Sequence, residues 1–322
     1  MVTHPVTLTS VSHARVYLTG GRHAVSTNDG TWISVHGVND IGLSEIPWQR
    51  HKHLQGTSLM LGNSAGANCY YHWMLDLLPK LGYLKRAGVD LNTINYFLVR
   101  ETVTPFQIES LKKFGIDSSK IIQTGKHPYL SCDEVLMVDL KHKVNMAMHQ
   151  FVPEWVNSVF KYQQAERSPR HESTEKIRLY LKRPIGVRRG IENEEALEAL
   201  LIKHGFEIAV MEGLSIEQQA KLLARAEIIV SPHGGALTNM VFAEAGTKVI
   251  EVFGTHVYPY YFGLATLCKH EYHAILQQPE DYANLVQLKT AMEVGTNENQ
   301  AITQREEFSV DLIALGNAIS AC

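Results

Sequence analysis

The fold is decided by the stretch IIVSPHGGALTN, which occupies residues 228–239. An apolar run of strand composition ends at Pro232, a turn with two glycines follows, and a helical pattern opens behind it. In an open α/β sheet such a turn, at the carboxyl end of a strand, is where ligands bind, and the N–H groups that begin the helix attract phosphate. A tight turn that serves packing alone explains these residue types equally well.

Strands alternate with helices on both sides of this stretch, over residues 176–306. The pattern predicts strands at 177–181, 207–210, 228–230 and 248–252, and helices at 194–204, 216–225 and through residue 239. Ser215 and Gln218 form a capping box that begins one of these helices. We therefore predict a doubly wound α/β domain. A helical apolar period within residues 307–322 predicts a C-terminal helix that packs back on the first domain.

Residues 1–166 are predicted to form that first domain. Short strands around the turn Asn28-Asp29-Gly30 predict a β-rich preface over residues 1–55. Behind it, strands at 96–99 and 135–138 alternate with helical patterns at 70–88, 105–114 and 152–165, which predicts a parallel, helix-covered sheet. Pro79 should start a new turn or kink its helix. The polar residues 167–175 predict a linker.

The composition narrows the classes of function. The 322 residues are 45% hydrophobic and 20% charged, which suits a well-packed protein of two domains, and a net charge of -3 gives no general attraction to nucleic acid. The four cysteines lie far apart and predict reduced thiols. Since no apolar run reaches ~18 residues and no signal peptide is present, we expect a cytoplasmic protein. The sequence has no GxxxxGK[ST] or GxGxxG motif, which disfavours kinases, ATPases and ordinary dehydrogenases.

Two further segments of the second half carry groups that suit a nucleotide. Arg183, Arg188 and Arg189 follow a predicted strand, and guanidinium groups bind diphosphate through two-pronged contacts. A solvated basic loop before a helix capped by Asn193 explains them as well. Glu251 interrupts an apolar strand near its end, where carboxylates commonly accept the hydroxyls of a ribose; an acid that faces the sheet edge is the alternative.

The first half carries a candidate for proton transfer. His72 and Asp76 lie four residues apart, so a helix places both on one face. The Asp76 carboxylate in that place is suited to take a proton from a sugar hydroxyl, or to orient His72 for that purpose. A local helix salt link with no catalytic part is the alternative.

Taken in order, these segments resemble glycosyltransferase family 61, which includes bacterial capsular-polysaccharide enzymes and xylosyl- and N-acetylglucosaminyltransferases. The resemblance covers about residues 70–253, more than half of the chain. It rests on four groups of residues: Tyr71-His72-Trp73 with Asp76 and Leu78-Pro79-Lys80; Arg183 with residues 188–194; Gly205-Phe206 with Glu212, Leu214 and Gln218; and residues 233–240.

The resemblance implies a GT-B fold, in which two Rossmann-like domains face a cleft, the second holding the nucleotide and the first the acceptor. It also implies inversion at the anomeric carbon with neither an obligatory metal nor another cofactor, which agrees with the missing Asp-x-Asp pair. The expected base is Asp76 with His72, and the expected ribose ligand is Glu251. The expected donor and diphosphate ligands are Arg183, Arg188, Arg189, His233, Gly234, Gly235, Ala236 and Asn239.

The expected partners are a nucleotide sugar, with UDP as the nucleotide, and a glycan or lipid-linked saccharide of surface-polysaccharide synthesis, such as capsule or lipopolysaccharide. Work on such an acceptor predicts peripheral association with the inner face of a membrane, and no nucleic acid is expected. Two alternatives remain open at this point. One is a nucleotide-sugar-binding scaffold without transfer, and the other is a GT-B-shaped sugar-nucleotide epimerase, which needs no acceptor.

Overall fold

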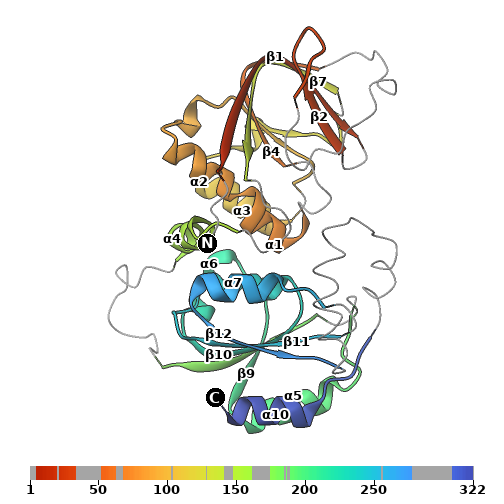
Figure 1. The fold of residues 1–322 in the computed structure, drawn as a ribbon, viewed down its shortest axis with the longest axis vertical. Coiled ribbons are helices and arrows are strands. Elements are labelled where there is room, and N and C mark those ends of the chain that lie inside the picture. Colours follow the sequence, from red (N-terminus) through yellow and green to blue (C-terminus); the bar gives the residue numbers. More distant parts are fainter. Residues whose placement is uncertain are drawn as a thin grey trace. The chain divides into compact units, whose positions relative to one another are not determined.

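The computed structural model describes two compact units, Met1–His142 and Lys143–Cys322. The described residues are 5–19, 22–33, 52–62, 68–102, 104–127, 129–140, 148–161, 175–184, 186, 189–254, 257–277 and 307–321. No helix within these ranges is long and apolar enough to span a membrane. Each unit is built on its own β-sheet (Figure 1).

The β-rich preface is confirmed, and it belongs to the sheet of the first unit. Strands β1 (Thr7–Thr19), β2 (Arg22–Ser26) and β3 (Trp32–Ile33) pair antiparallel. The predicted turn closes the β2–β3 hairpin, with Gly30 at a φ of 89°, a conformation that glycine adopts without strain. On its other side β1 pairs with β7 (Tyr129–Asp139) over most of its length.

The rest of this sheet is parallel, as the alternating pattern predicts. Strands β4 (Lys52–Gly62), β5 (Tyr96–Val99) and β6 (Ile121–Gln123) complete the order β3-β2-β1-β7-β4-β5-β6. The first unit is thus a mixed seven-stranded sheet. Short 3-10 turns at Leu91–Thr93 and Ser118–Lys120 precede β5 and β6, and helix α3 (Pro105–Lys113) joins these two strands.

The predicted helix at 70–88 is divided into three parts. Helix α1 (Tyr70–His72) continues as a π-helix (Trp73–Leu77), and α2 (Pro79–Arg86) follows. Pro79 starts α2 at its first turn, where the missing N–H costs nothing. The wider turn is closed by a bond from the Leu78 N–H to the Trp73 carbonyl at 2.9 Å. The fully buried Trp73 ring anchors this segment by donating to the Ser110 hydroxyl at 2.8 Å.

The sheet of the second unit is parallel throughout and doubly wound. Its strands are β8 (Ile177–Lys182), β9 (Phe206–Val210), β10 (Ala226–Pro232), β11 (Lys248–Val252) and β12 (Glu271–Ile275). They lie in the order β12-β11-β10-β8-β9, so the direction of winding reverses between β8 and β10. That reversal is the topological switch point, where ligands bind in this class of fold.

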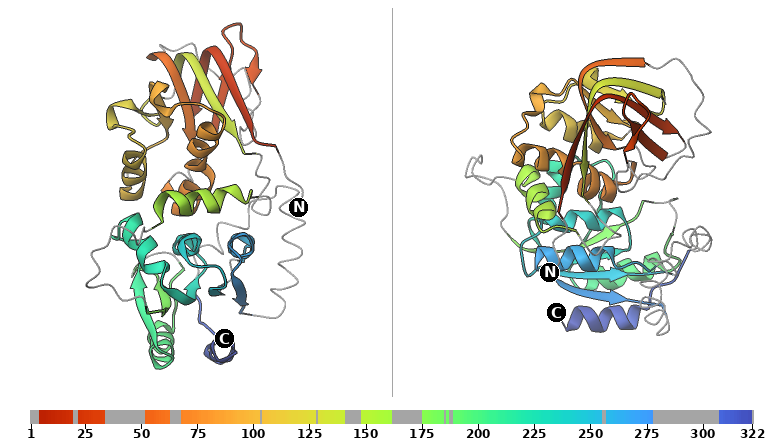
Figure 2. Two further views of the ribbon diagram at one scale, coloured as in Figure 1. Left: turned by 90° about the vertical axis from the view of Figure 1, so that its left-hand side faces the viewer. Right: turned by 45° about the horizontal axis from the view of Figure 1, so that its top comes forward.

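Helices cover both faces of this sheet (Figures 1 and 2). On one face lie α5 (Glu194–Lys203) and α10 (Leu312–Ser320). On the other lie α6 (Ile216–Leu223), a 3-10 helix called η7 (Gly235–Phe242) and α7 (Tyr260–Cys268). The capping box at the start of α6 is confirmed: the Gln218 N–H donates to the Ser215 hydroxyl at 3.1 Å, and the Ser215 N–H donates to the Gln218 side chain at 2.8 Å.

Helix α4 (Phe151–Phe160) corrects the predicted domain boundary. Its apolar face packs on η7, α6 and α7, so it belongs to the second unit, and the division falls at residues 142–143 rather than at 166. Of the predicted linker, residues 167–174 lie outside the described residues.

The predicted C-terminal helix is α10, which packs on α5 and β12 of the second unit. The buried side chains Phe308, Val310, Leu315 and Ile319 join the core of the second unit. Before α10, Phe308 bridges to Ile191: the Phe308 N–H donates to the Gly190 carbonyl at 3.2 Å, and the Glu192 N–H donates to the Phe308 carbonyl at 2.9 Å.

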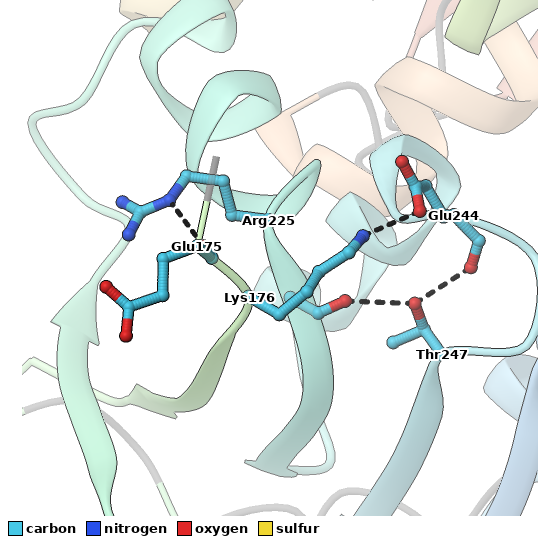
Figure 3. A network of polar contacts seen from close by, with 6 residues as sticks. Glu175, Lys176, Arg225, Glu244 and Thr247 are labelled. Carbon is cyan, nitrogen blue, oxygen red and sulfur yellow. Dashed lines mark hydrogen bonds and ion pairs between the residues drawn. The ribbon is translucent and has the colours of Figure 1, made fainter. Parts of the chain in front are cut away.

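The amino ends of the strands are joined by polar contacts (Figure 3). Lys176 Nζ and Glu244 Oε2 form an ion pair at 2.6 Å before β8. The Thr247 hydroxyl donates to the carbonyls of Glu244 at 2.8 Å and Ala226 at 3.1 Å, which connects β11 to β10. The Arg225 Nε donates to the Glu175 carbonyl at 3.2 Å. These contacts stabilise the sheet at the edge opposite to the one where the 228–239 turn lies.

Candidate functional site

The switch point of the second unit brings together an arginine and a glycine turn. Arg183 directly follows β8, and its guanidinium donates a hydrogen bond to the backbone carbonyl of His233, which directly follows β10. A Cβ on Gly234 would lie 2.8 Å from the Arg183 Nη2, so the end of that side chain would have to shift. Since the Gly234 φ of 170° is ordinary extended backbone, the glycine is needed for this close approach and not for its dihedral angle.

A second guanidinium adds positive charge to the same place. Burial and the neighbouring Arg189 lower the pKa of Arg183 to about 10, whereas Glu212 acts in the opposite direction. Arg189 itself has a φ of 64°, a left-handed conformation that costs a non-glycine residue about 1 kcal/mol or more. Two guanidinium groups that interact electrostatically suit a bound anion. Arg188 lies outside the described residues.

Lys182, the other cation of this segment, forms an ion pair with Glu198 on α5. Its charge is therefore compensated within the protein.

The His233 ring is held by Glu251, which is in turn held by Tyr272. The ring Nδ1 lies 2.5 Å from Oε1 of Glu251 on β11, and the hydroxyl of Tyr272 on β12 donates to Oε2 of the same carboxylate. Glu251 is 0% exposed and His233 is 7% exposed. Both Glu251 oxygens thus accept hydrogen bonds inside the protein, which departs from the ribose contact expected of this residue.

Aromatic rings surround His233. The ring of Phe253 stacks on it at a centroid distance of 5.3 Å, and Tyr261 meets it edge-on at 5.4 Å. Tyr258 and Tyr260 stack on each other at 5.2 Å, with their planes 3° apart, and each lies within 6.5 Å of the imidazole. The imidazole is therefore fixed in one plane next to the switch point.

Beyond the turn, Gly235 and Ala236 begin η7, which is a 3-10 helix rather than the expected α-helix. The first N–H groups of a helix have no carbonyl partner within it, so phosphate oxygens suit them as acceptors. Asn239 is placed differently from the prediction. Its fully buried side-chain amide donates to Gln219 Oε1 at 2.7 Å and to the Ala236 carbonyl at 3.1 Å. Asn239 therefore holds the turn against α6.

The first unit brings together His72 and Asp76, as the spacing predicts. The His72 Nδ1 lies 2.6 Å from Asp76 Oδ2, and the two side chains are 43% and 33% exposed. This hydrogen bond raises the pKa of His72 above its usual 6.5, and burial opposes the rise. Both residues lie at the π-helix, a rare geometry that is frequent at functional sites.

A lysine that the sequence analysis did not assign lies one helical turn further on. Lys80 Nζ donates to the Leu61 carbonyl at 2.8 Å. Burial lowers the pKa of Lys80 to about 8, while the charges of Asp76 and Asp139 oppose that change. Lys80 is thus a buried cation that interacts electrostatically with Asp76.

Within the described residues, no three His, Cys, Asp or Glu side chains lie close enough together to hold a metal ion. The metal independence implied by the resemblance stays a prediction.

A doubly wound sheet with an arginine and a glycine turn at its switch point defines a domain of the nucleotide-binding class. The family model described as Glycosyltransferase 61 matches residues 70–250, which is more than half of the chain. The chain belongs to glycosyltransferase family 61 and is a glycosyltransferase. Its substrates are accordingly a nucleotide-sugar donor and an acceptor. A search of curated proteins gave no significant match.

Three residues of the two sites were not predicted from the sequence: Lys80, Gln219 and Tyr272. The place of Tyr272 beside Glu251 can be recognised only from the strand register. It pairs with Val249, two residues before Glu251, so alternation puts its side chain on the same face of the sheet as the carboxylate. Lys80 had a signal in its spacing, four residues after Asp76. No spacing pattern in the sequence identifies Gln219, because its hydrogen-bond partner comes from a different helix.

Proposed function

We propose that this glycosyltransferase inverts the anomeric carbon of a nucleoside diphosphate sugar, with UDP as the nucleotide, and works without a metal. The observation that carries the proposal is the Arg183–Arg189 pair beside the Gly234 turn, because two guanidinium groups provide the charge that a metal would otherwise supply to a diphosphate. We further propose a GT-B arrangement, with the donor held by the second unit and the acceptor by the first.

The reaction we propose is a single displacement. The acceptor hydroxyl oxygen forms a bond to the anomeric carbon while the bond from that carbon to the diphosphate oxygen breaks. The electron pair leaves with the nucleoside diphosphate, and Arg183 and Arg189 stabilise the charge that develops there. The hydroxyl proton passes to Asp76, so all atoms and charges balance. Arg188, Gly235 and Ala236 belong to the same proposed diphosphate site.

The His72–Asp76 pair supports the assignment of the base. A carboxylate that is 33% exposed remains accessible to an acceptor, and its hydrogen bond to His72 fixes one oxygen at 2.6 Å. The buried Lys80 ammonium adds a cation that interacts electrostatically with Asp76. His72 thereby orients the base and shares its proton.

For the acceptor we propose a glycan or lipid-linked saccharide of surface-polysaccharide synthesis, at the inner face of a membrane. The support for this part is the family resemblance alone.

A screen of nucleotides and nucleotide sugars for thermal stabilisation tests the donor site. A ligand present at 100 times its Kd stabilises the folded state by about 2.7 kcal/mol, so UDP and UDP-sugars should raise the melting temperature clearly. The matched variant is Arg183→Met, in which the rise should disappear. A wild-type protein that no nucleoside diphosphate stabilises would refute the proposed donor.

Two incubations of the stabilising donor separate this reaction from its alternatives. Donor alone, followed by NMR of the sugar, should show slow hydrolysis to free sugar of inverted configuration. A new epimer of the intact nucleotide sugar would identify an epimerase, and a donor left unchanged both alone and with acceptors would identify a scaffold.

A further inference from the structure

We propose that Glu251 and Tyr272 are positioning residues, which hold the His233 ring and, through it, the diphosphate-binding turn of the donor site. The inference deepens the proposed function and depends on it for the identity of the ligand. It gives Glu251 a task that differs from contact with a ribose.

The backbone of His233 is already fixed on two sides. Its N–H donates to the Val252 carbonyl at 2.9 Å, and its carbonyl accepts from the Arg183 guanidinium. The contact of the ring with Glu251 is the third point of attachment, and it comes from a different direction. Three such points leave the residue no freedom to rotate, so the orientation of the N–H groups that follow it is set by these contacts.

The chemistry of the carboxylate determines which ring nitrogen carries hydrogen. An ionised carboxylate accepts hydrogen bonds only, and its burial is costly unless donors surround it. Tyr272 supplies one donor, through its O–H, to Oε2. The other oxygen, Oε1, lies 2.5 Å from the Nδ1 of His233. Because the carboxylate only accepts, this hydrogen bond requires hydrogen on that nitrogen. Glu251 therefore fixes both the place of the imidazole and its Nδ1–H form.

The surroundings of the carboxylate argue against a direct ligand contact. Glu251 is 0% exposed, and each of its oxygens already accepts a hydrogen bond. A ribose would have to displace Tyr272 or His233 to reach it, which would leave a buried group without its partner. The 7% exposed His233 lies between this carboxylate and Arg183, in the position of a connecting residue.

Glu251→Gln is the informative variant. The amide keeps the size of the side chain, but it satisfies the ring in either of two orientations, so the requirement for hydrogen on Nδ1 is lost. Tyr272→Phe removes one donor to the carboxylate and keeps the ring. Lys176→Met and Glu244→Gln are matched controls, because Lys176 Nζ pairs with Glu244 Oε2 at 2.6 Å at the opposite edge of the same sheet.

Two measurements on the full chain report on the two parts of the inference. The first is the ¹⁵N NMR spectrum of histidine-labelled protein, with the His233 signals identified by their loss in His233→Asn. The second is the Kd for UDP from calorimetry. We expect Glu251→Gln to remove the Nδ1–H signature and to weaken UDP binding about tenfold, the effect of losing one charged hydrogen bond. Tyr272→Phe should weaken the Nδ1–H signal and UDP binding by a smaller factor. If Glu251→Gln does not fold, Tyr272→Phe provides the test.

The controls should keep both the histidine signature and the wild-type Kd. An unchanged His233 signal in Glu251→Gln overturns the inference, and so does an equal loss of UDP affinity in Lys176→Met or Glu244→Gln. The failure of the proposed function looks different. In that case the Glu251→Gln variant loses the Nδ1–H signature as expected, while the wild-type protein binds no nucleoside diphosphate.

Discussion

The guanidinium of Arg183 donates a hydrogen bond to the backbone carbonyl of His233, across the point where the winding of the sheet reverses. Since the carbonyl is main chain, this contact depends on the shape of the turn and not on the imidazole. It joins β8 to β10 at their carboxyl ends, and it brings positive charge next to Gly234. The first two predictions follow from this contact.

Gly234→Ala should weaken donor binding. The new methyl group would lie 2.8 Å from Arg183 Nη2, so either the guanidinium or the turn must move. We expect the Kd for UDP to rise about tenfold or more, measured by calorimetry, with overpacking costing about 1–3 kcal/mol of stability. Gly316→Ala on α10 is the control, because nothing lies within 4 Å of the added Cβ, and it should stabilise the helix by about 0.5–1 kcal/mol. Equal affinity in the two variants would contradict this prediction.

Arg183→Lys should not substitute for arginine at the switch point. A lysine keeps the charge but offers a single point contact instead of a planar fork, so it cannot hold the His233 carbonyl and a diphosphate oxygen together. We expect UDP affinity to fall by about 10- to 100-fold, with the folded state retained. Arg178→Lys at the amino end of β8, where Nε pairs with Glu227 at 2.9 Å, should leave affinity unchanged. Wild-type affinity in Arg183→Lys would remove the arginine from the donor site.

Asp76→Asn should abolish transfer and leave donor binding near that of the wild type. The amide keeps the shape of the side chain but cannot take a proton, so kcat should fall by about 100-fold or more at unchanged Kd for the donor. Asp117→Asn is the control, since either side chain caps the 3-10 turn that starts at Ser118. Retained turnover in Asp76→Asn would refute the assignment of the base.

The pKa of His72 should fall in the Asp76→Asn variant, because the hydrogen bond to the carboxylate raises it in the wild type. NMR titration of the His72 ring measures both values. For a base with a raised pKa, the contribution to stability is complete below pH 6.5 and is lost as the pH rises through the folded-state pKa. At this degree of exposure the pair contributes about 0.2–1 kcal/mol. A folded-state pKa at or below 6.5 in the wild type would contradict the geometry.

Lys80→Met should change how stability depends on pH above neutrality. The folded chain loses the Lys80 proton near pH 8, and the unfolded chain keeps it until about 10.5, the ordinary value. Between these values the unfolded state binds more protons, so the free energy of unfolding contributed by this group rises with pH. Urea unfolding at pH 7.5 and 10 should show that rise in the wild type relative to Lys80→Met. Parallel curves for the two proteins would refute a buried, pKa-shifted lysine.

Much of the fold follows from local patterns in the sequence. Strands β5 and β11 have the predicted bounds, and α3 and the α6 capping box agree with the prediction to within a residue or two. These elements have a clear hydrophobic period or begin at a helix-capping motif. Strand β12 was missed because its exposed and half-buried residues alternate weakly, and its place is set by pairing with β11. The π-helix depends on how Trp73 packs, which no local pattern encodes.

The site was predictable where one segment carries it. His72 and Asp76 are neighbours by helix geometry, and Gly234 is placed by the end of β10. The tasks of Glu251 and Asn239 were not predictable, because each is decided by a partner far along the chain, namely Tyr272 on β12 and Gln219 on α6. Composition shows that a carboxylate is present in a strand, but only the sheet register shows which side chains reach it.

The bridge between Phe308 and Ile191 matters for anyone who divides this protein into fragments. The family match ends at residue 250, yet the loop that carries Arg189 is held in place by hydrogen bonds that Gly190 and Glu192 form with Phe308, nearly 120 positions later. Phe308 also packs so closely on Gly254 that a Cβ there would lie 2.6 Å from its ring. A recombinant fragment limited to the matched residues would therefore contain both arginines but would lack the contacts that position Arg189.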